Sequence, residues 1–134
     1  MSRERFLERQ ADVRASAARL AEAVSQPAGD IVRDATIQRF EFTFEAVWKT
    51  LNLWLEHQGH SCASPRATLK CAFEQGPMRD ADEADVWLRM LEDRNLTSHA
   101  YDQALATRIH DHVVRAYADA IARMAATIAG LRWD

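Results

Sequence analysis

Apolar side chains recur at steps of three, four and seven positions between Ser2 and Val24. They are Phe6, Val13, Ala17, Leu20 and Val24. This spacing is typical of an amphipathic α-helix that buries one face. Pro27 and Gly29 follow, and because both residue types interrupt helices, the first predicted helix ends near Val24.

A wide apolar stripe predicts a long second helix that begins after Asp30 and continues to about His57. Its members are Phe40, Phe44, Val47, Trp48, Leu51, Trp54 and Leu55. Asp30 is a favourable N-cap residue, and Gly59 marks the end of the helix. Residues 39–45 alternate between polar and apolar side chains, as a β-strand would. We reject the strand because the helical period continues on both sides and no turn residue bounds this piece.

Two shorter helices are predicted in the middle of the chain. The first begins at Ser64–Pro65, with serine as the cap and proline at the first helical position, and it ends at Gly76–Pro77. The next begins after Asp80, which with Glu83 has the spacing of a capping box. An apolar series through Trp87, Leu88 and Leu91 supports this fourth helix.

The last predicted helix begins near Tyr101 and continues to Gly130. Its apolar positions are Ile109, Val113, Tyr117, Ile121, Met124 and Ile128. With only four Gly and three Pro among 134 residues, the chain has few turns, so its elements must be long. We therefore predict an all-α, up-and-down bundle that forms a single domain over residues 1–134.

The formal net charge of −3 provides no overall positive field, and we expect no DNA partner. The arginines of the first helix could form a local basic patch, although a solvated helix face is the simpler interpretation. These are Arg3, Arg5, Arg9, Arg14 and Arg19. No segment resembles a signal peptide or a membrane span, so we expect a cytoplasmic protein without a membrane partner. Cys62 and Cys71 are then expected to be free thiols.

Polar side chains that can donate, accept or transfer protons are concentrated between Glu92 and Asp102, at the junction before the last helix. A simple connection needs only a few polar residues. Arg94 can hold a phosphate through paired hydrogen bonds, and His99 can transfer a proton near neutral pH. Asn95 can orient either group. Arg94 and His99 are five positions apart, so their side chains meet on one side only if the helix bends or breaks between them.

Other polar residues have structural interpretations. Glu45 and Lys49 have the spacing of a surface ion pair, and His110 and His112 are expected at the surface. Four possible zinc ligands occur between residues 57 and 71, but their spacing fits no standard zinc finger, so we predict no metal site and no cofactor. They are His57, His60, Cys62 and Cys71.

The segment Arg94–His99 resembles the Arg-Asn…His signature of HEPN domains, and Tyr101 extends it to Arg-x4-His-x-Tyr. The extended form resembles the HEPN toxins paired with minimal nucleotidyltransferases, also called nucleotidyltransferase substrate-binding proteins. Arg39–Leu51 is similar to the second helix of that group, and Ser64–Arg66 and Trp87–Asn95 also fit. Three motifs in the right order cover most of the chain.

This resemblance implies a four-helix up-and-down bundle with a short extra helix. It also implies a homodimer in which the Arg-His motifs of two subunits lie close to a shared cleft. Many proteins of this group are metal-independent ribonucleases. The implied partner is a small nucleotidyltransferase that neutralises the toxin by adding AMP to the motif tyrosine, here Tyr101. Without the resemblance, Tyr101 is interpreted as an aromatic anchor of the last helix.

Two functions are compatible with the motif. In the first, the protein is a toxin that cleaves RNA to a 2′,3′-cyclic phosphate. His99 then acts as general base or acid, Arg94 stabilises charge on the phosphate, and Asn95 positions one of them. In the second, the protein is a non-catalytic adaptor that binds the nucleotidyltransferase and presents a substrate or nucleotide to it. Both place the function at the same motif.

Overall fold

The computed structural model describes residues 2–134, and within that range it contains six α-helices and no β-strand. The helices are α1 (Ser2–Val24), α2 (Asp30–His57), α3 (Pro65–Gln75), α4 (Ala81–Leu96), α5 (Gln103–His112) and α6 (Ala118–Ala129). A 3₁₀ turn, η1 (Thr97–His99), follows α4, and a π-helical turn, η2 (Val113–Tyr117), joins α5 to α6. The all-α prediction is confirmed.

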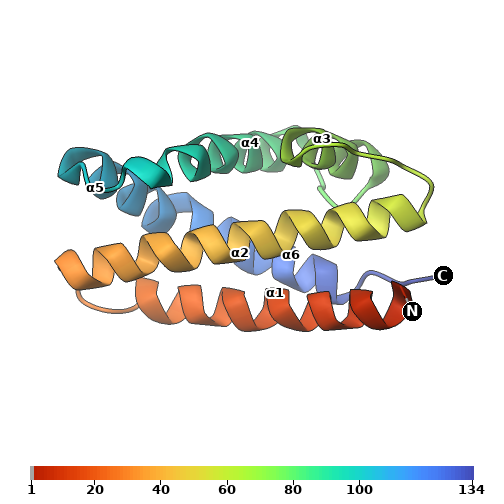
Figure 1. Cartoon of the computed structure of the whole chain (residues 1–134), viewed down its shortest axis with the longest axis horizontal. Coiled ribbons are helices and arrows are strands. Elements are labelled where there is room, and N and C mark those ends of the chain that lie inside the picture. The colour runs from red at the N-terminus through yellow and green to blue at the C-terminus, as the bar shows by residue number, and fades with distance from the viewer. Residues whose placement is uncertain (1) are drawn as a thin grey trace.

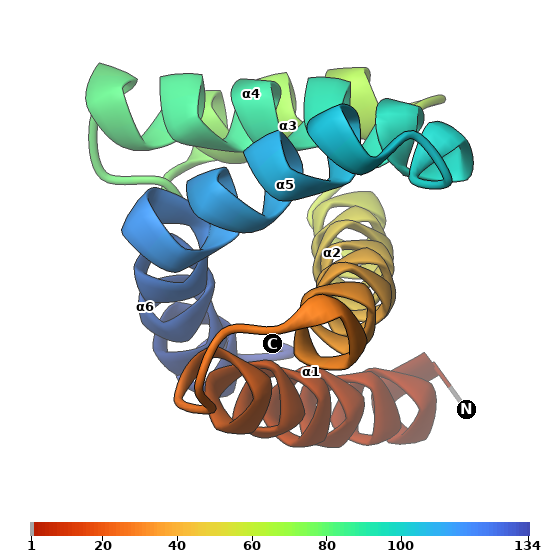
Figure 2. The ribbon, with the colours of Figure 1, turned by 90° about the vertical axis from the view of Figure 1, so that its left-hand side faces the viewer.

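Four helical rods form an up-and-down bundle, and α3 is the short extra helix beside α4 (Figures 1 and 2). The rods are α1, α2, α4 and the continuous run from α5 to α6, and successive rods alternate in direction. Both ends of the chain lie at the same end of the bundle (Figure 1). There the amide of Gln10 donates to the carbonyl of Ile128 at 2.8 Å. The predicted architecture is confirmed.

Helix α2 contacts all five other α-helices and supplies much of the core. Its buried residues are Thr36, Ile37, Phe40, Thr43, Phe44, Val47, Thr50, Leu51 and Leu55. Phe40 stacks on Tyr117 with ring centroids 5.5 Å apart, and Phe44 stacks on Trp87 at 5.9 Å. Burying each large apolar side chain contributes roughly 1.5–3 kcal/mol, so the spacing of these residues fixes which face of α2 points inward.

Side-chain caps set the boundaries of the two middle helices. The hydroxyl of Ser64 accepts from the backbone N–H of Ala67, and Asp80 accepts from that of Glu83. Glu83 in turn accepts from the backbone N–H of Arg79 at 2.8 Å, which completes a box-like cap. Both caps agree with the prediction.

The predicted cap of α2 is wrong. Asp30 is the first residue within the helix, and Gly29 occupies the cap position without a side-chain hydrogen bond. The carboxylate of Asp30 instead lies 3.6 Å from Arg33, one turn further along the helix. A carboxylate in the first turn is still favourable, because the unpaired backbone N–H groups there carry positive partial charge.

The last helical run differs from the prediction at its start and in its middle. Asp102 accepts from the backbone N–H groups of Ala104 and Leu105, so α5 begins at Gln103 and Tyr101 lies in the preceding turn. The run is also interrupted by η2, where one extra residue per turn is inserted. Among the described residues, no helix combines the length and apolarity needed to cross a bilayer.

Candidate functional site

Arg94 is held by a carboxylate from a different helix. Its side chain leaves the last turn of α4 and reaches Glu45 on α2, with Nε 3.0 Å and Nη2 2.7 Å from the same oxygen, Oε1. Both side chains are about one-third exposed, at 31%. One edge of the guanidinium is therefore fixed by Glu45, and the remaining N–H groups can bind an anion from solvent.

The second oxygen of Glu45 is also engaged. Oε2 accepts from the indole N–H of Trp48 at 2.8 Å and lies 3.9 Å from the ammonium of Lys49. The predicted pair between Glu45 and Lys49 exists, but it is the longest of the contacts that Glu45 makes. The carboxylate mainly orients Arg94 and Trp48, a role that the spacing alone did not reveal.

The chain bends between Arg94 and His99 because α4 ends in a 3₁₀ turn. The hydroxyl of Thr97, which is buried, donates to the carbonyl of Arg94 at 2.7 Å, and the N–H of Ala100 donates to the carbonyl of Thr97 at 3.1 Å. These local bonds replace the α-helical backbone hydrogen bonds with which α4 would otherwise continue. His99 therefore lies at the exposed end of η1.

His99 and Tyr101 lie next to each other. Their ring centroids are 6.1 Å apart in an edge-on arrangement, and both side chains are exposed, Tyr101 to 84%. Asn95 is exposed on α4. Among the described residues, no side-chain hydrogen bond joins Arg94, Asn95 and His99 to one another. One chain thus brings His99 to Tyr101 and Arg94 to α2.

Tyr101 also lines an open pocket of about 560 Å³, with polar and apolar side chains in its lining, between the turn and the first half of α2. The polar residues on the opposite wall are Asp34, Gln38 and Glu41. Spacings of four and three place them on the same face of α2, and one more step of four reaches Glu45. The polar face of α2 therefore extends from the tyrosine to the arginine of the motif.

A buried carboxylate lies directly beside the motif in the sequence. Asp93, which is only 7% exposed, accepts through Oδ2 from the hydroxyl of Tyr117 and contacts Nδ1 of His112, both at 2.7 Å. Because a carboxylate only accepts, Nδ1 of His112 carries the proton in this contact. His112 is partly exposed, in keeping with its predicted surface position, but it is also bonded to Asp93, a contact that the sequence did not predict.

The π-helical turn explains how two residues of one helix reach the same carboxylate oxygen. In a regular α-helix, positions 112 and 117 would differ by about 140° around the axis. Hydrogen bonds between residues five apart bring such positions onto one side. Burial, followed by the hydrogen bond from Asp93, raises the pKa of Tyr117 above its usual range, so this phenol stays protonated near neutral pH.

The residues considered for zinc do not converge. Among residues 2–134, no three His, Cys, Asp or Glu side chains are grouped to hold a metal ion. His57 instead stacks on Trp133, with ring centroids 3.7 Å apart. Cys62 and Cys71 are free thiols, and burial with a contact to Cys62 raises the pKa of Cys71 to about 11.

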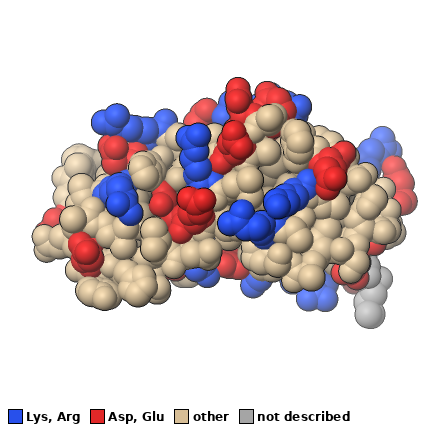
Figure 3. Space-filling view, turned by 90° about the horizontal axis from the view of Figure 1, so that it is seen from above, with Lys and Arg blue, Asp and Glu red and all other residues tan. Residues whose placement is uncertain are grey.

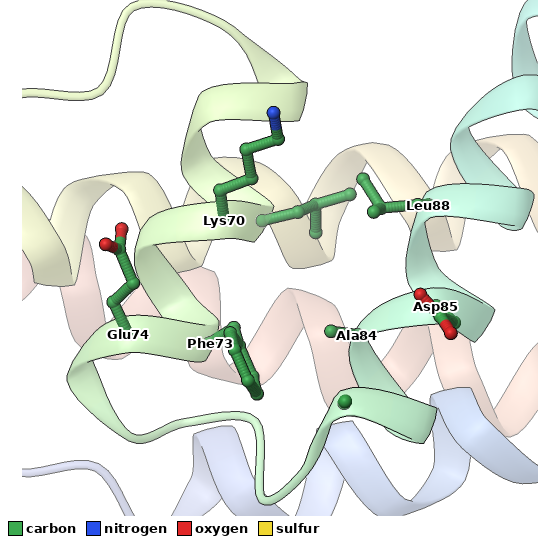
Figure 4. A pocket seen from close by; sticks show the side chains of 8 residues that line it. Lys70, Phe73, Glu74, Ala84, Asp85 and Leu88 are labelled. Carbon is green, nitrogen blue, oxygen red and sulfur yellow. The ribbon is translucent and has the colours of Figure 1, made fainter.

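A second pocket, of about 420 Å³, lies between α3 and α4, away from the motif (Figure 4). Phe73 and Ala84 face each other across it, and Glu74 points away. The surface seen from the side of α3 and α4 carries interspersed cationic and anionic side chains (Figure 3). The lining is mainly apolar, with Lys70, Glu74 and Asp85 among its residues, and it contains no histidine or other residue of the motif, so the motif remains the candidate site.

The comparisons with known proteins agree on family and fold. The family model described as "Nucleotidyltransferase substrate binding protein like" matches residues 8–129. A crystal structure of a protein from Thermus thermophilus is 37% identical, with a TM-score of 0.79, over 87% of this chain and 98% of the other. No curated protein matches the sequence.

Two more distant structures share the fold. The toxin-antitoxin MntA-HpeT is 18% identical with a TM-score of 0.76, over 94% of this chain and 98% of the other. A tri-AMPylated Shewanella oneidensis HEPN toxin in complex with MNT antitoxin is 19% identical with a TM-score of 0.73, over 94% and 97%. This chain belongs to the nucleotidyltransferase substrate-binding protein family and has a HEPN-like fold.

Proposed function

We propose that this protein is the HEPN toxin of a toxin–antitoxin pair and acts as a metal-independent endoribonuclease. The observation that carries the proposal concerns Arg94, whose guanidinium is held by Glu45 of α2. Arg94 lies in the last turn of α4, the helix that leads into the exposed His99. A preoriented guanidinium suits the growing charge of a phosphate in a transition state. An exposed imidazole suits proton transfer. The family membership and the two toxin–antitoxin neighbours support the same function.

In the proposed reaction, the ribose 2′-oxygen attacks the adjacent phosphorus while the bond to the 5′-oxygen breaks. His99 accepts the 2′ proton or donates a proton to the leaving oxygen. Arg94 stabilises the negative charge with the N–H groups that Glu45 leaves free, and Asn95 positions the phosphate. RNA supplies its own nucleophile, so no metal-bound water is needed, and the product is a 2′,3′-cyclic phosphate.

A homodimer completes the proposed site. The side chains of Arg94 and His99 in one chain each contact other groups, and no side-chain hydrogen bond joins them in the described residues. A second subunit that places its own motif against the first brings four such groups to one cleft. Within that cleft, one His99 can act as base and the other as acid, which the two proton transfers of the reaction require.

Tyr101 is the proposed site of control by a minimal nucleotidyltransferase. Its hydroxyl is accessible, since the side chain is 84% exposed, and its ring lies against His99. The Shewanella oneidensis neighbour is tri-AMPylated and bound to its MNT antitoxin. Transfer of AMP to the Tyr101 hydroxyl, with loss of pyrophosphate from ATP, would add bulk and negative charge beside His99 and exclude RNA phosphates.

The second candidate is a non-catalytic subunit that binds a substrate or nucleotide for the nucleotidyltransferase. The family description favours it, and so does the carboxylate that already occupies one edge of Arg94. In this case His99 only donates or accepts a hydrogen bond. The two candidates differ in whether the isolated protein cleaves RNA.

Cleavage assays with purified protein separate them. We expect the parent to cleave single-stranded RNA and His99→Ala to be slower by ~10²–10⁴-fold. His60→Ala, a matched change in the loop after α2, should retain full activity. If the parent binds the nucleotidyltransferase but cleaves no RNA, the adaptor is correct. If His99→Ala cleaves as fast as the parent, His99 is not the proton-transfer group.

A further inference from the structure

A basic groove lies between α1 and α2. Arg5 and Arg9 of α1 face Trp48, Lys49 and Asn52 of α2 across a hollow of about 240 Å³. The remaining lining residues are Leu53 and Glu56. Three cationic side chains therefore share a small hollow with one carboxylate and one aromatic ring.

The two arginines of this groove have no protein counter-ion. The ion pairs of the described residues engage Arg33, Arg39, Arg79, Arg94, Arg115, Arg123 and Arg132. Among the described residues, no carboxylate oxygen lies within 4.0 Å of a side-chain nitrogen of Arg5 or Arg9. Lys49 contacts only Glu45, at 3.9 Å. The groove thus has uncompensated positive charge that an anionic ligand can neutralise.

A chain of side-chain contacts links the groove to the candidate site. Trp48 donates its indole N–H to Oε2 of Glu45, and Oε1 of the same carboxylate holds Arg94. Lys49 lies on the same oxygen as Trp48. A strand with one phosphate at Arg94 can therefore extend over Trp48 and place its neighbouring phosphates against Lys49, Arg9 and Arg5.

The chemistry of the groove matches single-stranded nucleic acid. Such strands are bound by grooves that combine cationic side chains for the phosphates with aromatic rings on which bases stack. The Trp48 ring is partly exposed at the groove, and its N–H is already bonded to Glu45, which fixes the plane of the ring. An acidic protein surface would also neutralise the positive charge of the groove, but it would offer no base to stack on the Trp48 ring.

We propose that the groove formed by Arg5, Arg9, Trp48 and Lys49 binds the phosphate backbone of the single-stranded RNA that the motif cleaves. This inference rests on the proposed ribonuclease function and adds a path for the strand beyond the scissile phosphate. Arg5, Arg9 and Lys49 bind without contacting the reacting atoms, so they contribute to KM rather than to the proton transfers.

The test is the affinity and cleavage of a labelled single-stranded RNA by full-length protein. Arg5→Glu/Arg9→Glu should weaken binding by more than ~10-fold and reduce the salt dependence by about 0.7 in log–log slope for each phosphate that is no longer bound. Arg14→Glu/Arg19→Glu makes the same change in charge on exposed positions of α1 outside the groove, and it should change affinity by less than ~2-fold. Helicity and melting temperature, measured for each variant, verify the fold.

The outcomes separate this inference from the proposed function. If the parent cleaves RNA and both double variants bind RNA equally well, the groove does not bind the strand, although the ribonuclease stands. If the groove variant loses only its affinity for the nucleotidyltransferase, the surface binds that protein and the inference is overturned. If the parent neither binds nor cleaves RNA, the ribonuclease function itself fails. Lys49→Gln provides a milder variant, and it should raise KM more than it lowers kcat.

Discussion

Glu45 and Arg94, which are 49 residues apart in the sequence, form the closest ion pair that connects α2 to the motif helix. Both the Nε and Nη2 atoms of Arg94 contact a single oxygen, Oε1 of Glu45. The carboxylate therefore fixes the direction of the guanidinium before any ligand binds. Preorientation of this kind lowers the cost of stabilising a transition state, because the donor does not have to be ordered during the reaction.

Replacing Glu45 with Ala should reduce RNA cleavage by about tenfold, because Arg94 then loses its orienting partner. The stability change should be within ~1 kcal/mol, since the pair is one-third exposed and screened by solvent. Glu45→Gln, which retains one acceptor oxygen, should recover part of the rate. Glu8→Ala on α1 is the control for removal of an exposed carboxylate. Unchanged cleavage by Glu45→Ala would show that the pair is only structural.

Asp93 should matter much more for stability than Glu45. Asp93→Ala leaves the buried hydroxyl of Tyr117 and the Nδ1–H of His112 without their acceptor, which should cost about 3 kcal/mol. Tyr117→Phe removes only one donor and should cost about 1 kcal/mol. Urea unfolding of the three proteins measures both values. A loss below ~1 kcal/mol for Asp93→Ala would mean that the cluster does not stabilise the junction of α4 with η2.

The raised pKa of Tyr117 predicts a loss of stability in alkali. The unfolded protein releases the phenolic proton near pH 10, whereas the folded protein retains it to a higher pH. Protonated Tyr117 therefore contributes stability that is complete below pH 10 and is lost as the pH rises toward the folded-state value. Above about pH 10, the free energy of unfolding should fall more steeply with pH for the parent than for Tyr117→Phe. Parallel curves for the two proteins would exclude this linkage.

Tyr101 should be dispensable for folding but required for modification. Because the side chain is 84% exposed, Tyr101→Phe should change the free energy of unfolding by less than ~0.5 kcal/mol. Incubation with the nucleotidyltransferase and ATP should add AMP to the parent and not to Tyr101→Phe, as measured by intact mass. Modified parent should lose its RNA cleavage, and unmodified Tyr101→Phe should keep it. AMP on the phenylalanine variant would place the acceptor elsewhere.

Local patterns were sufficient to predict most of the fold. The apolar period of α2 and the caps at Ser64 and Asp80 are consequences of neighbouring residues, so the sequence contains them directly. The cap at Asp30 failed because Gly29 took that position, a choice of one residue that propensity does not resolve. The same locality let the motif between Arg94 and Tyr101 be found by its density of polar residues.

The contacts that orient the motif could not be predicted, because they join residues far apart. The partner of Arg94 comes from α2, and among several carboxylates on that helix only the packing of α2 against α4 selects Glu45. The binding of His112 and Tyr117 to one oxygen of Asp93 depends on the π-helical turn. An α-helical register places those two positions on different sides, so the sequence period indicated a continuous helix instead.

The chemical ends of the RNA fragments formed in the presence of EDTA provide the sharpest test of the proposed metal-independent cleavage. Purified parent should cleave single-stranded RNA under these conditions and leave 2′,3′-cyclic phosphate and 5′-hydroxyl ends, identified by mass spectrometry of a short defined RNA. His99→Ala and Arg94→Ala should leave that RNA intact over the same time. Intact RNA with the parent, or 5′-phosphate ends on the fragments, would contradict the account.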